Sequence, residues 1–144
     1  MIKFSSMDVK KTKADTLVVP VCEDKKIHTD RALAALCKRA LAVKEFKAGA
    51  KDELILYNPP QLKIERAVFI GLGKADDMTV ETLRTFMGCA VKKCTSLDLM
   101  QIVVAIPAGK RIKLDETATM EALIESAYLA KMRDNCDRSW HGDD

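Results

Sequence analysis

The amino-acid composition has no strong bias that would by itself indicate a function. Its 24 basic and 21 acidic residues leave a net charge of +3, too small to indicate binding to nucleic acid or to a membrane surface. No apolar run approaches the roughly 20 residues of a membrane-spanning helix, and the first residues do not resemble a signal peptide. We therefore expect a cytoplasmic protein that has no membrane segment and no nucleic-acid partner.

Histidine is scarce, and the cysteines follow no recognisable spacing. The five cysteines are odd in number and contain no Cys-x-x-Cys pair, which favours free thiols in a reducing compartment. The two histidines are His28 and His141. A catalytic zinc needs about three protein ligands, and a solvated loop explains His28 beside Cys22 and Glu23 better than a metal site does. The sequence thus predicts no metal site and no catalytic residue in this chain.

The chain length suits one domain, and the apolar pattern predicts an α/β fold. We assign residues 1–134 to a single α/β domain and residues 135–144 to a polar tail. Strands are predicted at 2–5, 15–21, 53–57, 66–72 and 101–106, and helices after Thr29 or Asp30, after Thr79, and from Asp115 to Arg133. Interleaved strands and helices predict a mixed, mostly parallel sheet of about five strands flanked by helices.

The most informative stretch is Arg66-Ala67-Val68-Phe69-Ile70-Gly71-Leu72-Gly73-Lys74. Its nearly unbroken apolar run predicts a central strand buried on both faces. Ligands in α/β sheets bind beyond the carboxyl ends of strands, so Gly71, Leu72, Gly73 and Lys74 are the candidate ligand-binding residues. Backbone amides, a nearby helix start and a lysine are groups that hold an anion.

The same turn departs from the known phosphate-binding motifs. A Walker loop needs four residues between its glycines and a Ser or Thr after the lysine, and a dinucleotide fingerprint needs a third glycine where Asp76 stands. Asp76 and Asp77 would also repel a phosphate. A tight turn after a buried strand is therefore the competing interpretation of residues 71–74.

Other candidate groups have ordinary structural explanations. Cys89 and Cys94 do not share a helix face and are expected to be buried, and Glu121 with Glu125 is expected on a solvated helix face. Gly88 interrupts a predicted helix at a cost of about 1 kcal/mol relative to alanine, and a close packing contact there would be a reason to keep it. Pro20 has no N–H to donate and should lie at the end or edge of its strand.

Several stretches, taken in order, resemble the amino-terminal domain of the leucyl (cytosol) aminopeptidase family. They are Leu17-Val18-Val19-Pro20-Val21-Cys22-Glu23-Asp24-Lys25-Lys26, Phe46-Lys47-Ala48-Gly49, Glu53-Leu54-Ile55-Leu56-Tyr57, the stretch from Arg66 to Lys74, and Leu83-Arg84. Glu125, Ala127 and Leu129-Ala130-Lys131 resemble the family's closing helix. The resemblance covers most of residues 14 to 133.

This resemblance implies a non-catalytic domain with a fold similar to macro domains. In the family, two divalent metal ions, zinc or manganese, belong to a separate carboxy-terminal catalytic domain, whose Asn-Thr-Asp-Ala-Glu-Gly-Arg signature is absent here. The implied partners are that catalytic domain and, for the parent enzyme, a hexamer. The alternatives are a macro-like module that binds ADP-ribose or a nucleotide at residues 71–74, and nucleic-acid binding.

Overall fold

The computed structural model describes residues 2–5, 13–60, 62–99, 101–108, 112 and 114–141, with backbone alone at residue 5 and beyond residue 132. The elements are β1 (Ile2–Ser5), β2 (Lys13–Cys22), α1 (Arg31–Leu41), β3 (Glu53–Tyr57), β4 (Lys63–Gly73), the short 3-10 helix η2 (Ala75–Asp77), α2 (Val80–Ser96), β5 (Ile102–Ala105) and α4 (Glu116–His141). Apart from η2, this is the predicted order of strands and helices. In this part of the chain, no helix is both long and apolar enough to cross a membrane.

The strands form one five-stranded sheet in the order β1-β5-β2-β4-β3. The pairs β1–β5, β5–β2 and β2–β4 are parallel, and only the edge strand β3 is antiparallel to its neighbour β4. The predicted fold class, a mixed and mostly parallel sheet flanked by helices, is confirmed.

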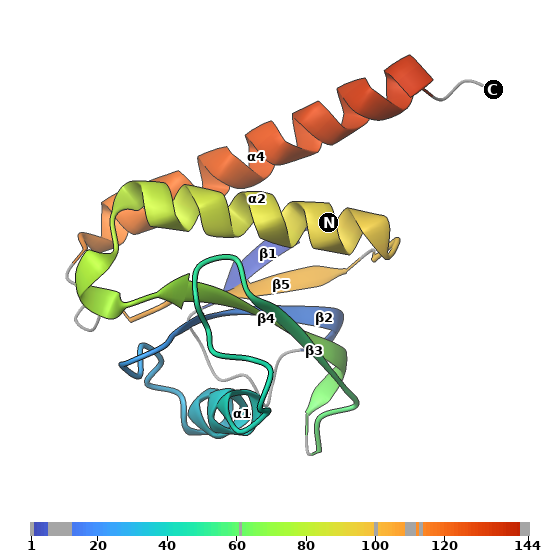
Figure 1. Cartoon of the computed structure of the whole chain (residues 1–144). Helices are drawn as coiled ribbons and strands as arrows, with labels where there is room; N and C mark the ends of the chain where they lie inside the picture. Colours follow the sequence, from blue (N-terminus) through green and yellow to red (C-terminus); the bar gives the residue numbers. More distant parts are fainter. Residues whose placement is uncertain are drawn as a thin grey trace.

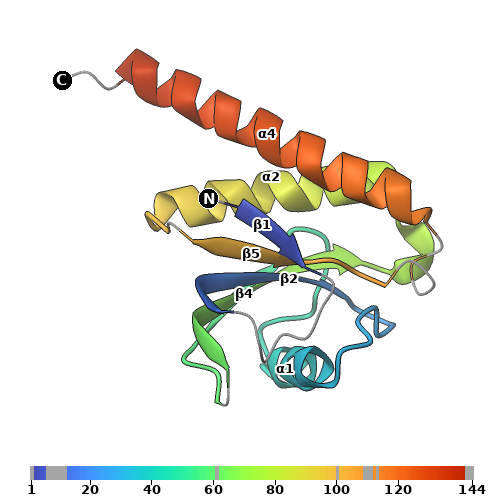
Figure 2. The same ribbon diagram turned by 180° about the vertical axis from the view of Figure 1, so that it is seen from behind.

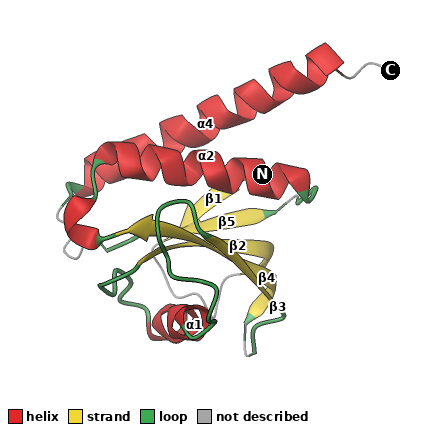
Figure 3. Ribbon diagram, in the orientation of Figure 1, coloured by secondary structure: helices red, strands yellow, loops and turns green. Residues whose placement is uncertain are grey.

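Helices cover both faces of the sheet (Figure 1). Helix α1 lies on one face, and α2 and α4 lie together on the other, as the reverse view also shows (Figure 2). The colouring by secondary structure separates the three layers, with the strands between the helices (Figure 3). In each view α4 crosses α2 and extends beyond the sheet.

Strand β4 is internal and buried on both faces, as its apolar run predicts. Val68 and Ile70 belong to the core under α2 and α4, whereas Ala67 and Phe69 belong to the core over α1. Phe69 has 0% exposed surface, and its ring lies 6.5 Å from that of Phe46, centroid to centroid. The strand starts at Lys63, whereas the prediction starts it at Arg66. Its first residues alternate between exposed and buried positions, so the continuous apolar run that marks the rest of the strand does not include them.

The helices begin at the predicted capping residues. Asp30 precedes α1, and its Oδ1 accepts a hydrogen bond from the Leu33 N–H at 3.0 Å. Thr79 and Thr82 form a reciprocal capping box at the start of α2, in which each hydroxyl accepts from the other residue's N–H. Both caps satisfy amides that have no partner inside the helix.

Packing does not explain Gly88 of α2, because a Cβ placed there would meet nothing within 4 Å. One expectation about the helices is wrong. Helix α4 continues past the predicted end at Arg133 to His141, so the predicted tail from residue 135 is helical up to that point. Polar residues give no apolar periodicity, and a helix that extends beyond the body of the domain does not need one. Residues 142–144 lie outside the described residues.

Candidate functional site

The turn after β4 is shaped by a close approach of two backbone segments. Gly71 lies directly against loop 46–52, and a Cβ placed on it would collide with backbone atoms of Ala48 and Gly49. Gly73 adopts a φ of +83°, a left-handed conformation that favours glycine. The close backbone approach thus requires glycine at position 71, and the backbone conformation favours it at position 73.

The amides of these glycines are engaged within the chain. The Gly71 N–H donates to the Asp52 carbonyl at 2.8 Å, and the Gly73 N–H donates to the Ala48 carbonyl at 3.0 Å. The carbonyl of Gly71 accepts from the Lys51 N–H at 3.1 Å. An anion at this turn would have to compete with these bonds for the two glycine amides.

A pocket of about 460 Å³ nevertheless lies beside the turn, between β4, loop 46–52 and the first turns of α2. All four predicted residues, Gly71 to Lys74, line this pocket. Its charged lining residues are Lys51, Lys74, Asp77 and Glu81, two of each sign, so the side chains supply no net positive charge. Ligand binding at residues 71–74 stays a prediction.

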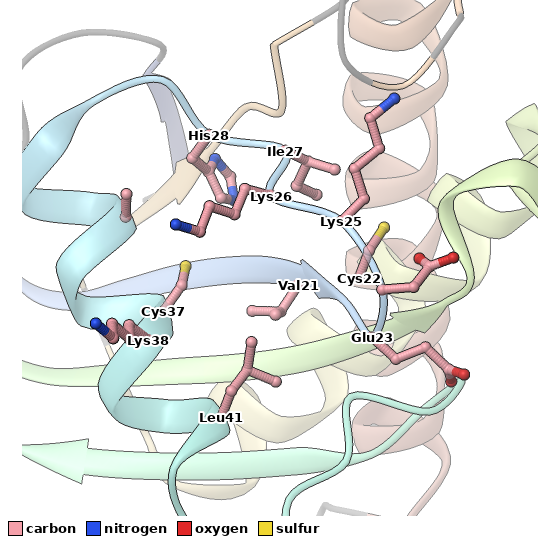
Figure 4. A pocket seen from close by; sticks show the side chains of 12 residues that line it. Val21, Cys22, Glu23, Lys25, Lys26, Ile27, His28, Cys37, Lys38 and Leu41 are labelled. Atoms are coloured by element: carbon pink, nitrogen blue, oxygen red, sulfur yellow. The ribbon is translucent and has the colours of Figure 1, made fainter.

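The carboxyl end of β2 carries a second pocket, which the sequence reasoning missed. Its volume is about 250 Å³, and it is lined by the end of β2, the connection 23–28 and one side of α1 (Figure 4). The rule that ligands bind beyond strand ends applied to Val21 and Cys22 as well as to Gly71. No glycine motif follows β2, so the sequence carries no local signal for a pocket at that strand end.

His28 lines this second pocket, and the expectation of a solvated histidine is wrong. Its side chain is buried, with 6% of the residue exposed, and Nε2 lies 2.7 Å from the Pro20 carbonyl oxygen. Nε2 therefore carries the proton and donates, which leaves Nδ1 as an acceptor that is buried and has no partner. Burial, as the largest cause, lowers the pKa of His28 below its usual value.

Pro20 lies on a side of β2 where its missing N–H costs no ladder hydrogen bond. Thr16 donates its N–H toward β5, and because backbone groups alternate along a strand, Pro20 faces that side too. Pairing between β2 and β5 ends at Val18, so none of the described strands pairs with Pro20 on that side. Proline near the end of β2 matches the prediction, and the His28 ring supplies the donor for its carbonyl.

The thiols near these pockets are poor nucleophiles. Burial raises the pKa of Cys37 to about 12 and that of Cys22 to about 11, so both stay protonated at neutral pH. The Cys22 thiol donates to Met78 Sδ at 3.6 Å. Cys94 is buried as predicted, and Cys89 is only partly buried.

The described carboxylates form no cluster suited to a metal ion. Among the residues that the structure describes, no group of three His, Cys, Asp or Glu side chains is placed to hold one. Glu121 and Glu125 are both exposed, and Glu125 lies 3.7 Å from Arg84 of α2, which confirms the solvated face.

The fold defines the general class of the domain. The macrodomain of Mycobacterium tuberculosis DarG aligns with a TM-score of 0.63 at 13% identity, over 88% of this chain and 89% of that one. A mutant of tomato leucine aminopeptidase aligns with a TM-score of 0.64 at 16% identity, over 90% of this chain and 27% of that one. At these identities the likeness concerns the fold, which is macrodomain-like.

Sequence comparison gives the family. The model of the cytosol aminopeptidase family, N-terminal domain, matches residues 10–139, so the chain belongs to that family. A probable cytosol aminopeptidase of Acidobacterium capsulatum is 36% identical over 101 residues, 70% of this chain and 20% of that protein. One from Desulfovibrio desulfuricans is 23% identical over 137 residues, 92% of this chain and 27% of that protein. The chain thus spans only a fifth to about a quarter of these relatives.

Proposed function

We propose that this chain acts as the non-catalytic amino-terminal domain of a cytoplasmic leucyl-type metallo-aminopeptidase, an enzyme that releases amino-terminal residues from peptides. The observation that carries the proposal is the match to the N-terminal domain model over residues 10–139, in a chain with a small fraction of its relatives' length. The two divalent ions, zinc or manganese, would be held by the catalytic domain. The domain would support assembly, in the parent's hexamer, or access to the active site.

The surface of α4 supports a role in assembly. Ile124, Tyr128 and Met132 are exposed by 50%, 66% and 47%, and their spacing of four residues puts them on one side of the helix. Leu129 is 52% exposed beside them. We call these four residues the α4 stripe. Contiguous exposed apolar side chains are typical of an interaction surface, and we propose that the catalytic domain packs on this stripe.

The proposed role is tested on the native protein. An antibody raised against this chain precipitates it from the cells that produce it, and the precipitate is analysed by peptide mass spectrometry and assayed with leucine-p-nitroanilide. We expect peptides of an aminopeptidase catalytic domain in equal amount, together with metal-dependent hydrolysis. A precipitate that contains this domain without any such catalytic domain would contradict the proposal.

Hydrogen exchange tests the α4 stripe separately. Backbone amides of residues 124–132 should exchange more slowly in the native assembly than in the isolated chain. The amides of α1, on the opposite face of the sheet, serve as the internal control and should exchange equally in both. Equal exchange of residues 124–132 in both samples would exclude the stripe as the docking surface.

A further inference from the structure

Strand β3 has an open hydrogen-bonding edge. It is the last strand of the sheet and pairs with β4 on one side (Figure 1). The Asn58 N–H, just past the end of β3, donates to the Glu65 carbonyl at 2.8 Å. Because backbone groups alternate between the two sides of a strand, every second residue from there points its N–H and C=O away from β4. These residues are Glu53, Ile55 and Tyr57, and no described residue forms a hydrogen bond with their backbone groups.

The edge of β3 lacks the features that keep exposed strands from pairing. Natural edge strands carry a lysine, a proline or a bulge for this purpose. The sequence of β3 is Glu-Leu-Ile-Leu-Tyr, and its pairing with β4 runs without a shift in register. The opposite edge strand, β1, does carry a lysine, Lys3. Lys51 and Asn58 have φ of +69° and +49°, so the extended edge is confined to the residues between them.

The backbone of β3 is complementary to that of a second copy of itself. In an antiparallel pair centred on Ile55, that residue faces its own counterpart, and Glu53 faces Tyr57 of the second copy. Each of these three opposed pairs exchanges two hydrogen bonds, so every outward backbone group has a partner. A register shifted by two residues loses one pair, because Pro59 has no N–H and Lys51 is not extended. The centred register is therefore the best one, and it has two-fold symmetry.

The apolar side chains match in this register. Leu54 and Leu56 are half-buried at the margin of the core over α1. Each would lie directly opposite the other in the second copy. On the face toward α2, the half-buried Ile55 would lie against its own counterpart. Apolar side chains thus meet apolar side chains on both faces, as stable cross-strand pairs require.

The charged side chains on the α2 face are complementary in the same register. Arg66 lies opposite Tyr57 in the β3–β4 pair, and Glu53 of the second copy would lie on the other side of that tyrosine. Glu53 is also held on this face by Lys93 of α2, at 3.4 Å. Each row across the interface therefore carries opposite charges, and the tyrosine between them is 65% exposed in the single chain. In this register no two like charges face each other across the edge.

We propose that the chain forms a homodimer in which the two β3 edges pair antiparallel about Ile55 and join the two five-stranded sheets into one. An edge of five residues buries less than the 1,200–2,000 Å² of a stable interface, so the dimer is weak, with a Kd of about 0.1 mM. The contact lies on β3 and is separate from the α4 stripe. It is measured on this chain by itself, so it stands or fails independently of the aminopeptidase assignment.

A disulfide across the two-fold axis tests the register. Opposed residues of a hydrogen-bonded pair have Cα atoms about 5.5 Å apart, which a disulfide spans. The whole chain with Ile55→Cys, oxidised at about 0.2 mM, should give a covalent dimer whose linked peptides both contain residue 55. In Tyr57→Cys, the matched control, the two thiols would lie roughly 14 Å apart along the strands, so its cross-linking should be at least about five-fold lower. Cross-linking of the control that equals or exceeds that of Ile55→Cys would overturn the proposal.

Sedimentation measures the contribution of the edge to dimerisation. Ile55→Lys places two ammonium groups opposite each other and should weaken the dimer at least about ten-fold. Tyr57→Lys, the control, places its ammonium group opposite Glu53 and should change the Kd by less than about three-fold. Circular dichroism checks that both variants fold, and the disulfide test stands without them. A chain that stays monomeric at 1 mM, or equal losses in the two lysine variants, would overturn the proposal. A dimer that persists in Ile55→Lys would assign the contact to another surface, such as the α4 stripe.

Discussion

The close approach of β4 and loop 46–52 makes Gly71 the most crowded of the four glycines Gly49, Gly71, Gly73 and Gly88. In Gly71→Ala, the added Cβ meets backbone atoms of Ala48 and Gly49, which cannot rotate away as a side chain does. Either the loop or the strand has to move. Because β4 is hydrogen-bonded on both sides and packed on both faces, we expect the loop to yield.

The cost follows from the bonds that the loop would lose. Three backbone hydrogen bonds join it to the turn: Gly71 to Asp52, Lys51 to Gly71, and Gly73 to Ala48. At about 1 kcal/mol each, their loss lowers the free energy of unfolding by about 3 kcal/mol. A shift of the strand instead would cost about 1–3 kcal/mol, so both routes give a large effect.

Two other glycines provide matched controls for the same substitution. Gly73→Ala has room for its Cβ but keeps a φ of +83°, and should cost about 1 kcal/mol. Gly88→Ala, in the middle of α2 with nothing within 4 Å, should stabilise by up to about 1 kcal/mol. Urea titrations of the three variants should give this order. A loss below about 0.5 kcal/mol in Gly71→Ala would refute the role assigned to the loop.

Three further predictions follow from the core and the pockets. Phe69→Ala should lower the free energy of unfolding by about 3–5 kcal/mol in a denaturant titration, and a loss below 1 kcal/mol would count against burial on both faces. Because the folded-state pKa of His28 is lowered, its contribution to stability is present above pH of about 6.5 and is lost as the pH falls toward the folded pKa. His28→Gln should flatten this part of the curve of unfolding free energy against pH. An unchanged curve would exclude His28 as its cause. Calorimetry with ADP-ribose should find no tight binding, whereas a low-micromolar Kd abolished by a bulky residue at position 71 or 73 would favour the macro-like alternative.

The fold was largely predictable because its strands are marked by continuous apolar runs and its helices by capping residues. Residues 66–72 and 53–57, and the caps Asp30 and Thr79, lie where the pattern puts them. The misplaced boundaries lie where those signals are weak. The start of β4 alternates in polarity. The end of α4 extends beyond the core, so the sequence there shows no apolar pattern.

The candidate site was less predictable because it depends on contacts between distant segments. The glycines of residues 71–74 suggested free amides, but their partners come from loop 46–52, and no spacing rule identifies a loop that folds back onto a strand end. The charged neighbours of His28 indicate a solvated side chain, yet the side chain is buried and hydrogen-bonded to the Pro20 carbonyl. Neither contact follows from a spacing rule, although His28 and Pro20 are only eight residues apart.

The central claim, that this domain does not itself hydrolyse peptides, is tested most directly by assaying the purified chain beside the native precipitate. Both are supplied with manganese or zinc and leucine-p-nitroanilide at the same molar amount of domain. Metal-assisted hydrolysis needs several ligands around the ion, and the described residues offer no such cluster. We predict turnover in the native sample alone. Metal-dependent turnover by the purified chain, lost when Asp76 and Asp77 are replaced by alanine, would contradict the claim.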